Sequence, residues 1–394
     1  MSSVSVPVSS DLPAEWEMRT TINGRVYFAN HLLKTTQWQH PVTGKHIINK
    51  TDLPHEWREP EHNVKNDNTM FGMTYRFSES STAMHVLKGT NLKGHVVVIT
   101  GANSGIGFES AKALACHGAH VIMACRNMVK AQDSSTIVKN ECQCKGIEAK
   151  VDTMHLDLAS FKSVRLFAEN YKSRKLPLHV LICNAAVLGG SWQLTEDHIE
   201  RTFAINYLGH FLLIQLLQDL MVSSSPARIV MVSSESHRFQ DFDYSSKLCL
   251  SNVPLPKDKY WSILAYNQSK LCILLLSMEL NRRFHHFGVT SNAVHPGNLI
   301  YSSLCQTSWW YWVFFLIAKP FNKNPSQGAA TVVYCAADPE LEGVGGLYLN
   351  NCRQCTPSAE AMDQDKAKTL WDKSIRMIQR SDGLINTSND ILDI

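Results

Sequence analysis

Residues 95–108 read HVVVITGANSGIGF, and the rest of the chain can be interpreted outward from this stretch. A run of β-branched residues ends in three spaced glycines, and a helical pattern follows from Glu109 to His117. This order is typical of a buried strand, a tight turn and a helix N-terminus. Glycine lets the backbone approach a ligand closely, and the free N–H groups at a helix N-terminus attract an anion. The stretch therefore predicts a phosphate-binding turn, with a glycine turn that only packs a helix on a sheet as the alternative.

The composition indicates a globular protein with one large domain and small additions. The 394 residues are 44% hydrophobic and 19% charged, and the formal net charge is only +3. Such a balanced charge gives no reason to expect nucleic-acid binding. The first ten residues are polar and lack the basic and apolar segments of a secretory signal.

The eleven cysteines favour reduced thiols over a disulfide framework or a metal site. Five of them lie inside apolar segments, as buried thiols of an intracellular protein do: Cys116, Cys125, Cys183, Cys272 and Cys335. Two close pairs, Cys142/Cys144 and Cys352/Cys355, each lack an obvious second pair to complete a zinc set of about four ligands. We therefore predict no metal.

Strand-like and helix-like segments alternate from Leu92 onward. The predicted strands are 95–100, 120–125, 151–156, 178–183, 227–232, 289–294 and 346–350. The predicted helices are 105–117, 128–141, 160–172, 195–221, 260–286 and 326–337. Such alternation implies parallel strands joined by crossover helices, so we predict an α/β fold with a doubly wound, parallel Rossmann-type sheet. Ligands of such sheets bind at the carboxyl ends of the strands, where the candidate site residues should lie.

Polar residues follow four of the predicted strands: Arg126, Asp157, Asn184 and Ser234. The end of the second strand commonly meets the adenosine ribose, where an acidic residue favours NAD and an arginine favours the extra phosphate of NADP. Because Arg126 is present there and an acid is not, we predict NADP as the cofactor. A solvent-exposed arginine without this role is the alternative.

Tyr266 and Lys270 are four residues apart, which places them on one face of the predicted helix 260–286. A phenol titrates near pH 10, but a neighbouring ammonium favours the phenolate and lowers that pKa. The tyrosine can then act as an acid or a base near neutral pH. The pair alone is a common surface pattern, and its functional interpretation depends on Ser234 and on the phosphate-binding turn.

Together these segments resemble the short-chain dehydrogenase/reductase family over about residues 92–352. The matching stretches are Thr100–Gly107, Asp157-Leu158, Cys183-Asn184-Ala185, Asn206 in Asn-Tyr-Leu-Gly-His-Phe, Val232-Ser233-Ser234, Tyr266-Asn267-Gln268-Ser269-Lys270 and Val294-His295-Pro296-Gly297. The glycine spacing is Gly-x-x-x-Gly-x-Gly, which differs from the common Gly-x-Gly-x-x-Gly dinucleotide fingerprint. Ala186 is a departure, because the family usually has glycine at this position.

The resemblance implies a cofactor site and a catalytic tetrad. The pyrophosphate would bind Gly101, Ala102, Asn103, Ser104, Gly105, Ile106 and Gly107, with Asp157 near the adenine and Asn184 near the ribose. The tetrad would be Asn206, which supports a proton-relay water, Ser234, which orients the substrate oxygen, Tyr266, which donates or accepts the proton, and Lys270. The resemblance gives Lys270 two roles, since it would hold the nicotinamide ribose and lower the pKa of Tyr266.

An aromatic pattern near the N-terminus predicts a small three-stranded antiparallel sheet. The expected strands are 16–20, 25–30 and 35–39, with Asn23-Gly24 as a hairpin turn. Two tryptophans, an aromatic pair, Asn-His and a final proline make this segment similar to a WW domain, a family that binds proline-rich peptides. The resemblance implies a peptide-binding face made of Tyr27, Ala29, His31, Lys34, Thr36 and Trp38, with specificity for Pro-Pro-x-Tyr. A small core without a ligand is the alternative.

The predicted organisation is a disordered segment 1–10, a WW domain 11–44, a linker 45–91, the reductase domain 92–352 and a C-terminal helix and tail 353–394. Within the linker, Asp52–Trp57 begins a second WW pattern that does not continue, and 82–88 could form a short helix. The apolar run Trp309–Ala318 is about half as long as a membrane span, so we expect a buried helix or a lid over a substrate pocket.

Two functions follow from these resemblances. The first is an NADP-dependent oxidoreductase that acts on an apolar alcohol or carbonyl compound, such as a steroid or retinoid. The second is an adaptor that binds Pro-Pro-x-Tyr proteins and uses the reductase domain as a scaffold or cofactor sensor. The resemblance also implies a regulatory role in apoptosis and growth control, including Wnt signalling, and a location in the cytoplasm with the nucleus and mitochondrion as further sites.

Overall fold

The computed structural model describes residues 12–13, 15–20, 26–30, 35–37, 41–42, 69–70, 73–74, 76–239, 250–297 and 323–383. Contacts divide the chain into two compact units, Met1–Thr74 and Tyr75–Ile394. His31, Lys34 and Trp38 of the predicted peptide-binding face lie outside the described residues, as does the aromatic run 309–318.

The first unit contains the predicted three-stranded antiparallel sheet. Its strands are β1 (Trp16–Thr20), β2 (Val26–Asn30) and β3 (Thr35–Gln37), in the order β1-β2-β3. Phe28 and Asn30 occupy alternate positions of β2, and both side chains are buried. The register places Ala29 opposite Thr36 of β3. Two further short strands, β4 (Thr69–Met70) and β5 (Met73–Thr74), pair within the predicted linker.

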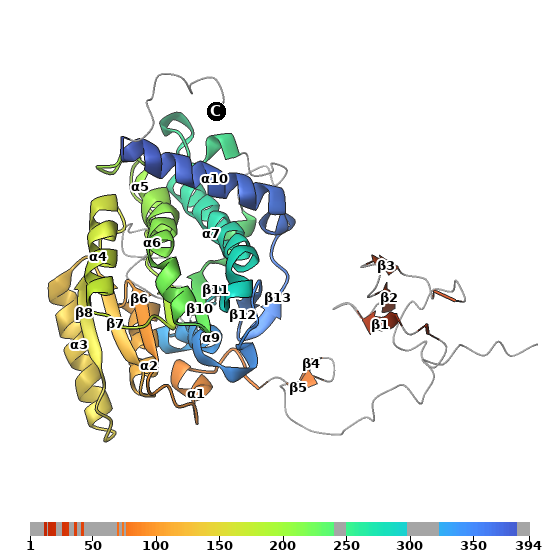
Figure 1. Ribbon diagram of the computed structural model, residues 1–394, viewed down its shortest axis with the longest axis horizontal. Helices are drawn as coiled ribbons and strands as arrows, with labels where there is room; N and C mark the ends of the chain where they lie inside the picture. The colour runs from red at the N-terminus through yellow and green to blue at the C-terminus, as the bar shows by residue number, and fades with distance from the viewer. Residues whose placement is uncertain are drawn as a thin grey trace, which may run out of the picture. The chain divides into compact units, whose positions relative to one another are not determined.

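The second unit is built on an eight-stranded sheet (Figure 1). Its strands are β6 (Val96–Thr100), β7 (His120–Cys125), β8 (Val151–His155), β9 (Val180–Cys183), β10 (Ala227–Val232), β11 (Val289–His295), β12 (Tyr348–Asn350) and β13 (Arg353–Cys355). They lie in the order β13-β12-β11-β10-β9-β6-β7-β8, and only the pairing of β12 with β13 is antiparallel. The order reverses between β6 and β9, and a doubly wound sheet binds its ligand at such a reversal.

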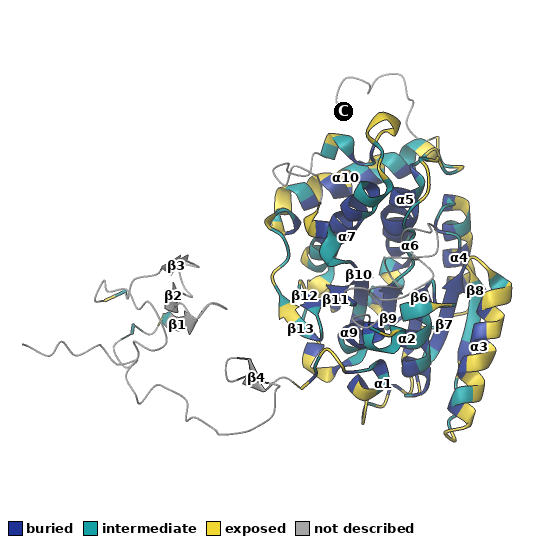
Figure 2. Ribbon diagram, turned by 180° about the vertical axis from the view of Figure 1, so that it is seen from behind, coloured by how far each residue is buried: buried dark blue, intermediate teal, exposed yellow. Residues whose placement is uncertain are grey.

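Helices cover both faces of this sheet. The longer helices are α2 (Gly105–Ala115), α3 (Met128–Gln143), α4 (Phe161–Ser173), α6 (Gly209–Ser223), α7 (Ser262–Phe284), α9 (Pro325–Ala337) and α10 (Gln364–Ser381). Shorter helical segments are α1 (Ala83–Val86), α5 (Arg201–Phe203), η4 (Ala204–Leu208), η5 (Glu235–Arg238), η6 (Leu250–Asn252), η7 (Lys257–Lys259), η8 (His285–Phe287), η11 (Pro339–Leu341) and η12 (Ala359–Met362). One apolar cluster joins α1, α2, α3 and α9 to one face, and a second joins α4, α6 and α7 to the other. Buried residues therefore line the inner sides of these helices and nearly the whole of the central strands β6, β9 and β10 (Figure 2).

The alternation of strands and helices predicted from the sequence is confirmed, with three differences. The predicted helix 195–221 begins only at Arg201, because Leu194 and Glu200 form a β-bridge and the Glu200 carboxylate caps the backbone N–H groups of Thr202 and Phe203. The edge strand β13 lies beyond the predicted domain end at residue 352 and runs antiparallel to its neighbour. The compact unit also starts at Tyr75, so the short helix α1, which the sequence places in the linker, packs on α2 and α9.

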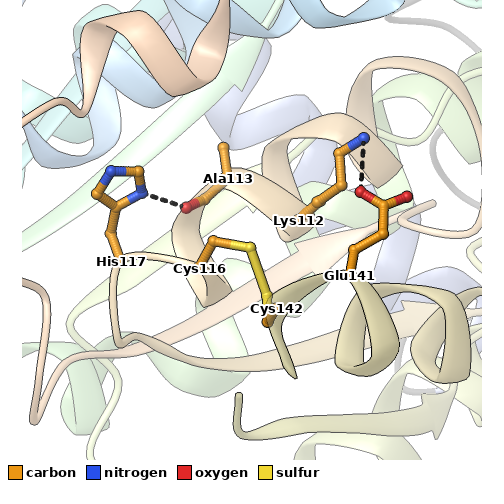
Figure 3. Close-up of a disulfide and its surroundings, with 6 residues drawn as sticks. All are labelled: Lys112, Ala113, Cys116, His117, Glu141 and Cys142. Atoms are coloured by element: carbon orange, nitrogen blue, oxygen red, sulfur yellow. Dashed lines mark hydrogen bonds and ion pairs between the residues drawn. A yellow bond between two sulfur atoms is a disulfide. The ribbon is translucent and has the colours of Figure 1, made fainter. Parts of the chain in front are cut away.

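One prediction about the cysteines is wrong. Cys116, expected to be a free thiol, forms a disulfide with Cys142, 26 residues later (Figure 3). The bond joins the C-terminal end of α2 to the C-terminal end of α3, and Lys112 and Glu141 of the same two helices form an ion pair beside it. Both cysteines face the same apolar layer, a proximity that sequence spacing does not show. The other described cysteines are free.

One helical stretch, Arg201–Ser223, is long and apolar enough to cross a bilayer by composition alone. Two thirds of its most apolar window (67%) is buried inside the domain, which is the usual situation of a core helix.

Candidate active site

The predicted phosphate-binding turn lies between β6 and α2. Gly101 and Gly105 adopt positive φ angles of 66° and 56°, which side chains other than glycine rarely tolerate. Gly107 lies in the first turn of α2, where an added Cβ would come within 2.5 Å of both Asn184 Nδ2 and Gly101 O. All three glycines are therefore required by the local backbone and packing, at the N-terminus of a helix, where backbone N–H groups attract an anion.

Thr100, the last residue of β6, connects this turn to β9. Its Oγ1 accepts hydrogen bonds from the backbone N–H groups of Asn184 (2.9 Å) and Ala185 (3.0 Å). In return, Asn184 Nδ2 donates to the carbonyl oxygens of Thr100 (2.9 Å) and Gly101 (3.3 Å). The structure thus places Asn184, which was predicted to lie near the cofactor ribose, directly against the glycine turn. Thr100 is not among the predicted site residues, and its only local signal is a hydroxyl at the end of an apolar strand.

The remaining cofactor candidates occupy the same edge of the sheet. Arg126 is exposed just after β7, and Asp157 is half-buried after β8, where its Oδ1 accepts from the Ala159 N–H at 3.0 Å. The backbone N–H groups of Ala102 and Asn103 point to the sulfur of Cys125, a thiol whose pKa burial raises to about 11. The turn 102–106 thus contacts Cys125 at the end of β7 and leads into the N-terminus of α2.

Tyr266 and Lys270 project from the same face of α7. Lys270 is only 2% exposed, and its Nζ donates to the carbonyl oxygen of Val232 at 2.8 Å. The same Nζ lies 5.4 Å from the centroid of the Tyr266 ring. Burial lowers the pKa of Lys270 to about 7. The predicted neighbourhood of a phenol and an ammonium is therefore present.

Ser234 and Asn206 reach this neighbourhood from other elements. Ser234 is half-buried two residues after the end of β10, where its Oγ accepts from the Ser236 N–H at 3.2 Å. Asn206 is fully buried in the π-helical segment η4. Its Nδ2 donates to Ser269 Oγ at 3.0 Å, and that hydroxyl donates to the Tyr266 carbonyl at 2.7 Å. All four tetrad candidates thus lie at the carboxyl ends of the central strands.

Both polar atoms of the Asn206 side chain form hydrogen bonds within the protein. Its Oδ1 accepts from the Val187 N–H at 2.8 Å, and its Nδ2 also donates to the Val187 carbonyl at 3.1 Å. The Asn206 amide is therefore held by Val187 and Ser269, and the main-chain oxygen of Asn206 lies 3.1 Å from His210 Nδ1.

Two histidines that the sequence analysis did not single out adjoin these residues. His210 Nδ1 contacts the main-chain oxygen of Asn206, and His237 Nδ1 contacts the main-chain oxygen of Ser234. Among the described residues, no group of three or more His, Cys, Asp or Glu side chains is arranged to hold a metal ion.

Comparisons with known proteins agree with this geometry. The family model of short chain dehydrogenases matches residues 95–246, and that of WW domains matches residues 12–41. WW domain-containing oxidoreductases of Gallus gallus and Homo sapiens are each 49% identical to this chain, over 95% and 94% of both sequences respectively. Retinol dehydrogenase 12 of Mus musculus is 37% identical over 73% of this chain and 87% of its own length.

Solved structures show the same fold. An uncharacterized protein from Mycobacterium paratuberculosis is 28% identical, with a TM-score of 0.57 over 73% of this chain and 95% of its own. A blue fluorescent protein from a metagenomic library is 25% identical, with a TM-score of 0.51 over 66% of this chain and 97% of its own. The chain thus combines the glycine turn and the buried lysine beside a tyrosine with an N-terminal three-stranded sheet. On this evidence the chain belongs to the WW domain-containing oxidoreductases of the short chain dehydrogenase family.

Proposed function

We propose that the reductase domain uses NADP to interconvert an apolar alcohol and its carbonyl compound. The observation that carries this proposal is the buried Lys270, whose Nζ is fixed by Val232 O and lies 5.4 Å from the Tyr266 ring centroid. Lys270 has no carboxylate partner within the part of the chain that the structure describes, and burying an unpaired lysine is costly, so its presence beside a phenol points to chemistry and not to stability.

Each tetrad residue has a role that follows from its position. Bound NADP supplies or accepts the hydride. Tyr266 donates a proton to the substrate oxygen during reduction, or accepts one during oxidation. An ammonium on Lys270 favours the phenolate, and an anionic cofactor phosphate nearby would in turn favour that ammonium. Ser234 Oγ holds the substrate oxygen, and the main-chain carbonyl of Asn206 supports the relay water.

The chain's residues fit an NADP molecule. The glycine turn and the start of α2 provide backbone N–H groups for the pyrophosphate, and exposed Arg126 provides a planar cation at the ribose end. The metagenomic relative that is 25% identical was solved in complex with NADPH. These observations favour NADP over NAD.

The substrate class rests on similarity. The Mus musculus relative is named a retinol dehydrogenase, and retinol is a long apolar alcohol. We therefore propose a retinoid- or steroid-like substrate for this chain. The aromatic run 309–315, which would suit a lid over such a molecule, lies outside the described residues.

The WW domain supports a second candidate function, which is compatible with the first. We propose that it binds Pro-Pro-x-Tyr segments through Tyr27, Ala29, His31, Lys34, Thr36 and Trp38. The specific observation is the register of β2 and β3, which places Ala29 beside Thr36. An adaptor could act through this face alone, with the reductase domain as a scaffold or cofactor sensor in growth and apoptosis signalling.

Two matched variants separate these functions. Tyr266→Phe should abolish NADPH-dependent reduction in a screen of alcohols and carbonyls, while binding of a Pro-Pro-x-Tyr peptide stays unchanged. Trp38→Ala should remove peptide binding and leave turnover unchanged. Turnover that survives in Tyr266→Phe would show that the acid–base assignment is wrong, and peptide affinity that survives in Trp38→Ala would exclude the proposed peptide-binding face.

A further inference from the structure

His210 and His237 are the most buried histidines near the tetrad. Their exposed fractions are 1% and 0%. His210 lies one helical turn after Asn206 on α6, and His237 lies three residues after Ser234 in η5. Each is therefore adjacent in sequence and in space to one tetrad residue, although neither is assigned a role in the proposed chemistry.

The hydrogen bonds of His210 determine its protonation state. Its Nδ1 is 3.1 Å from the main-chain oxygen of Asn206, which can only accept, so Nδ1 carries the hydrogen. Its Nε2 is 2.9 Å from Thr100 Oγ1. That hydroxyl already accepts from two backbone N–H groups, so its remaining bond is a donated one, and Nε2 is a nearer acceptor than the Ile182 carbonyl oxygen at 3.4 Å. His210 is therefore a neutral imidazole that accepts from Thr100 and donates to Asn206.

His237 has the same arrangement. Its Nδ1 donates to the main-chain oxygen of Ser234 at 2.7 Å, and its Nε2 accepts from the backbone N–H of Ser358 at 3.1 Å. Since a backbone N–H can only donate, Nε2 cannot carry a hydrogen there. The ring also packs edge-on against Tyr348, with centroids 5.3 Å apart. The two histidines thus share one tautomer and one kind of target, the carbonyl of a tetrad residue.

A second proton on either ring would oppose these contacts. A second proton on His210 Nε2 would be a third donor directed at Thr100 Oγ1. A second proton on His237 Nε2 would face the Ser358 N–H, which is also a donor. The charged groups around the rings are Lys270 near His210, and Arg238 and Glu235 near His237. Burial lowers the pKa of His210 to about 4, with Lys270 adding to the effect against the Asn206 carbonyl, and burial also lowers the pKa of His237.

We propose that His210 and His237 are a pair of positioning residues, each a neutral imidazole that holds the main-chain carbonyl of one tetrad residue with Nδ1 and a distant element with Nε2. His210 couples the cofactor-binding turn, through Thr100, to the Asn206 carbonyl. His237 couples the segment around Ser358 to Ser234. This inference rests on the proposed function for the roles of Asn206 and Ser234.

Asparagine and glutamine substitutions separate the two ends of each ring. The amide nitrogen of asparagine can replace Nδ1, whereas the longer glutamine places its amide at the position of Nε2. His210→Asn should keep the bond to Asn206, so kcat for NADPH-dependent reduction of all-trans-retinal stays within about threefold while the Kd of NADPH rises about fivefold or more. His210→Gln should do the reverse, with kcat lowered about tenfold or more and the Kd of NADPH nearly unchanged.

For His237, we expect one variant to change stability and the other to change turnover. His237→Asn should keep kcat and lower the melting temperature, because the Ser358 N–H loses its acceptor. His237→Gln should lower kcat about fivefold or more and keep the Kd of NADPH. Exposed His286, in η8, is the matched control, and its Asn and Gln variants should leave every constant unchanged. Equal effects of Asn and Gln at both positions would overturn the proposal.

A measurement on the wild-type protein does not depend on turnover. Nitrogen-15 chemical shifts of histidine-labelled protein should show the Nδ1–H tautomer for the two signals that disappear in the His210→Gln and His237→Gln variants. An Nε2–H tautomer or a charged ring at pH 7 would refute the proposal. If the tautomers are as expected and retinal is not reduced, the substrate assignment fails while the positioning of the two carbonyls stands.

Discussion

The Nζ of Lys270 donates a hydrogen bond of 2.8 Å to the main-chain oxygen of Val232, two residues before Ser234. This contact fixes the only cation of the proposed tetrad to the strand that carries its serine. Among the described residues, the buried ammonium has this one hydrogen-bond acceptor and no carboxylate partner. The domain thus tolerates a destabilising charge at the position where the proposed chemistry requires one.

Replacing Lys270 with methionine should stabilise the protein without cofactor and remove its activity. The pKa of Lys270 is lowered from 10.5 in an unperturbed lysine to about 7, so between these pH values the unfolded chain binds more protons than the folded one. Stability of the wild type should therefore rise with pH across this window. Melting curves should show a Lys270→Met advantage at pH 7 that shrinks toward pH 10. An advantage that does not vary with pH would contradict the assignment.

Gly107→Ala should weaken cofactor binding and the fold together. The added Cβ would lie 2.5 Å from both Asn184 Nδ2 and Gly101 O, so the turn must shift. We expect a loss of about 1–3 kcal/mol in the free energy of unfolding and a Kd of NADPH raised about tenfold or more. Gly343→Ala is the control for backbone strain alone, because Gly343 has a φ of +69° but nothing within 4 Å of an added Cβ, so this variant should lose stability without weakening NADPH binding. Unchanged NADPH binding in Gly107→Ala would show that this turn does not hold the cofactor.

Arg126→Ala should lower the affinity for NADPH and leave that for NADH unchanged. Loss of a charge-assisted hydrogen bond to a phosphate corresponds to about 10–100-fold in Kd. The control Lys130→Ala removes an exposed cation from the first turn of α3, four residues from Arg126. Titrations monitored by the fluorescence of each reduced cofactor would measure both constants. Equal affinities for the two cofactors in both Arg126→Ala and the wild type would exclude a phosphate contact at this residue.

The Cys116–Cys142 disulfide should contribute measurably to stability. Closing a loop of 26 residues in the unfolded chain corresponds to about 3 kcal/mol in a chain-entropy estimate. The double variant Cys116→Ser/Cys142→Ser should melt several degrees lower than wild type. Cys144→Ser, which changes an exposed free thiol, should not alter the melting temperature. If a reducing agent lowers the melting temperature of the wild type but not that of the double variant, the disulfide is the cause of the difference.

Much of the fold could be predicted because it is encoded locally. The apolar, β-branched run Val96–Thr100 indicates a buried strand from its own residues. The spacing of Tyr266 and Lys270 places both on one face of their helix, whatever packs against it. The start of the helix at Arg201 could not be predicted, because Glu200 caps it only after the chain has folded back to Leu194.

The sequence by itself determined the order of strands and helices, the glycine turn, the edge of the sheet where the site lies and the N-terminal three-stranded sheet. Only the tertiary structure decided how the site is held. Thr100 and His210 are 110 residues apart in the chain, and Cys116 and Cys142 belong to different helices. The physical reason is that periodicity and turn chemistry act within a few residues, whereas a hydrogen bond or a disulfide between distant residues depends on how whole elements pack.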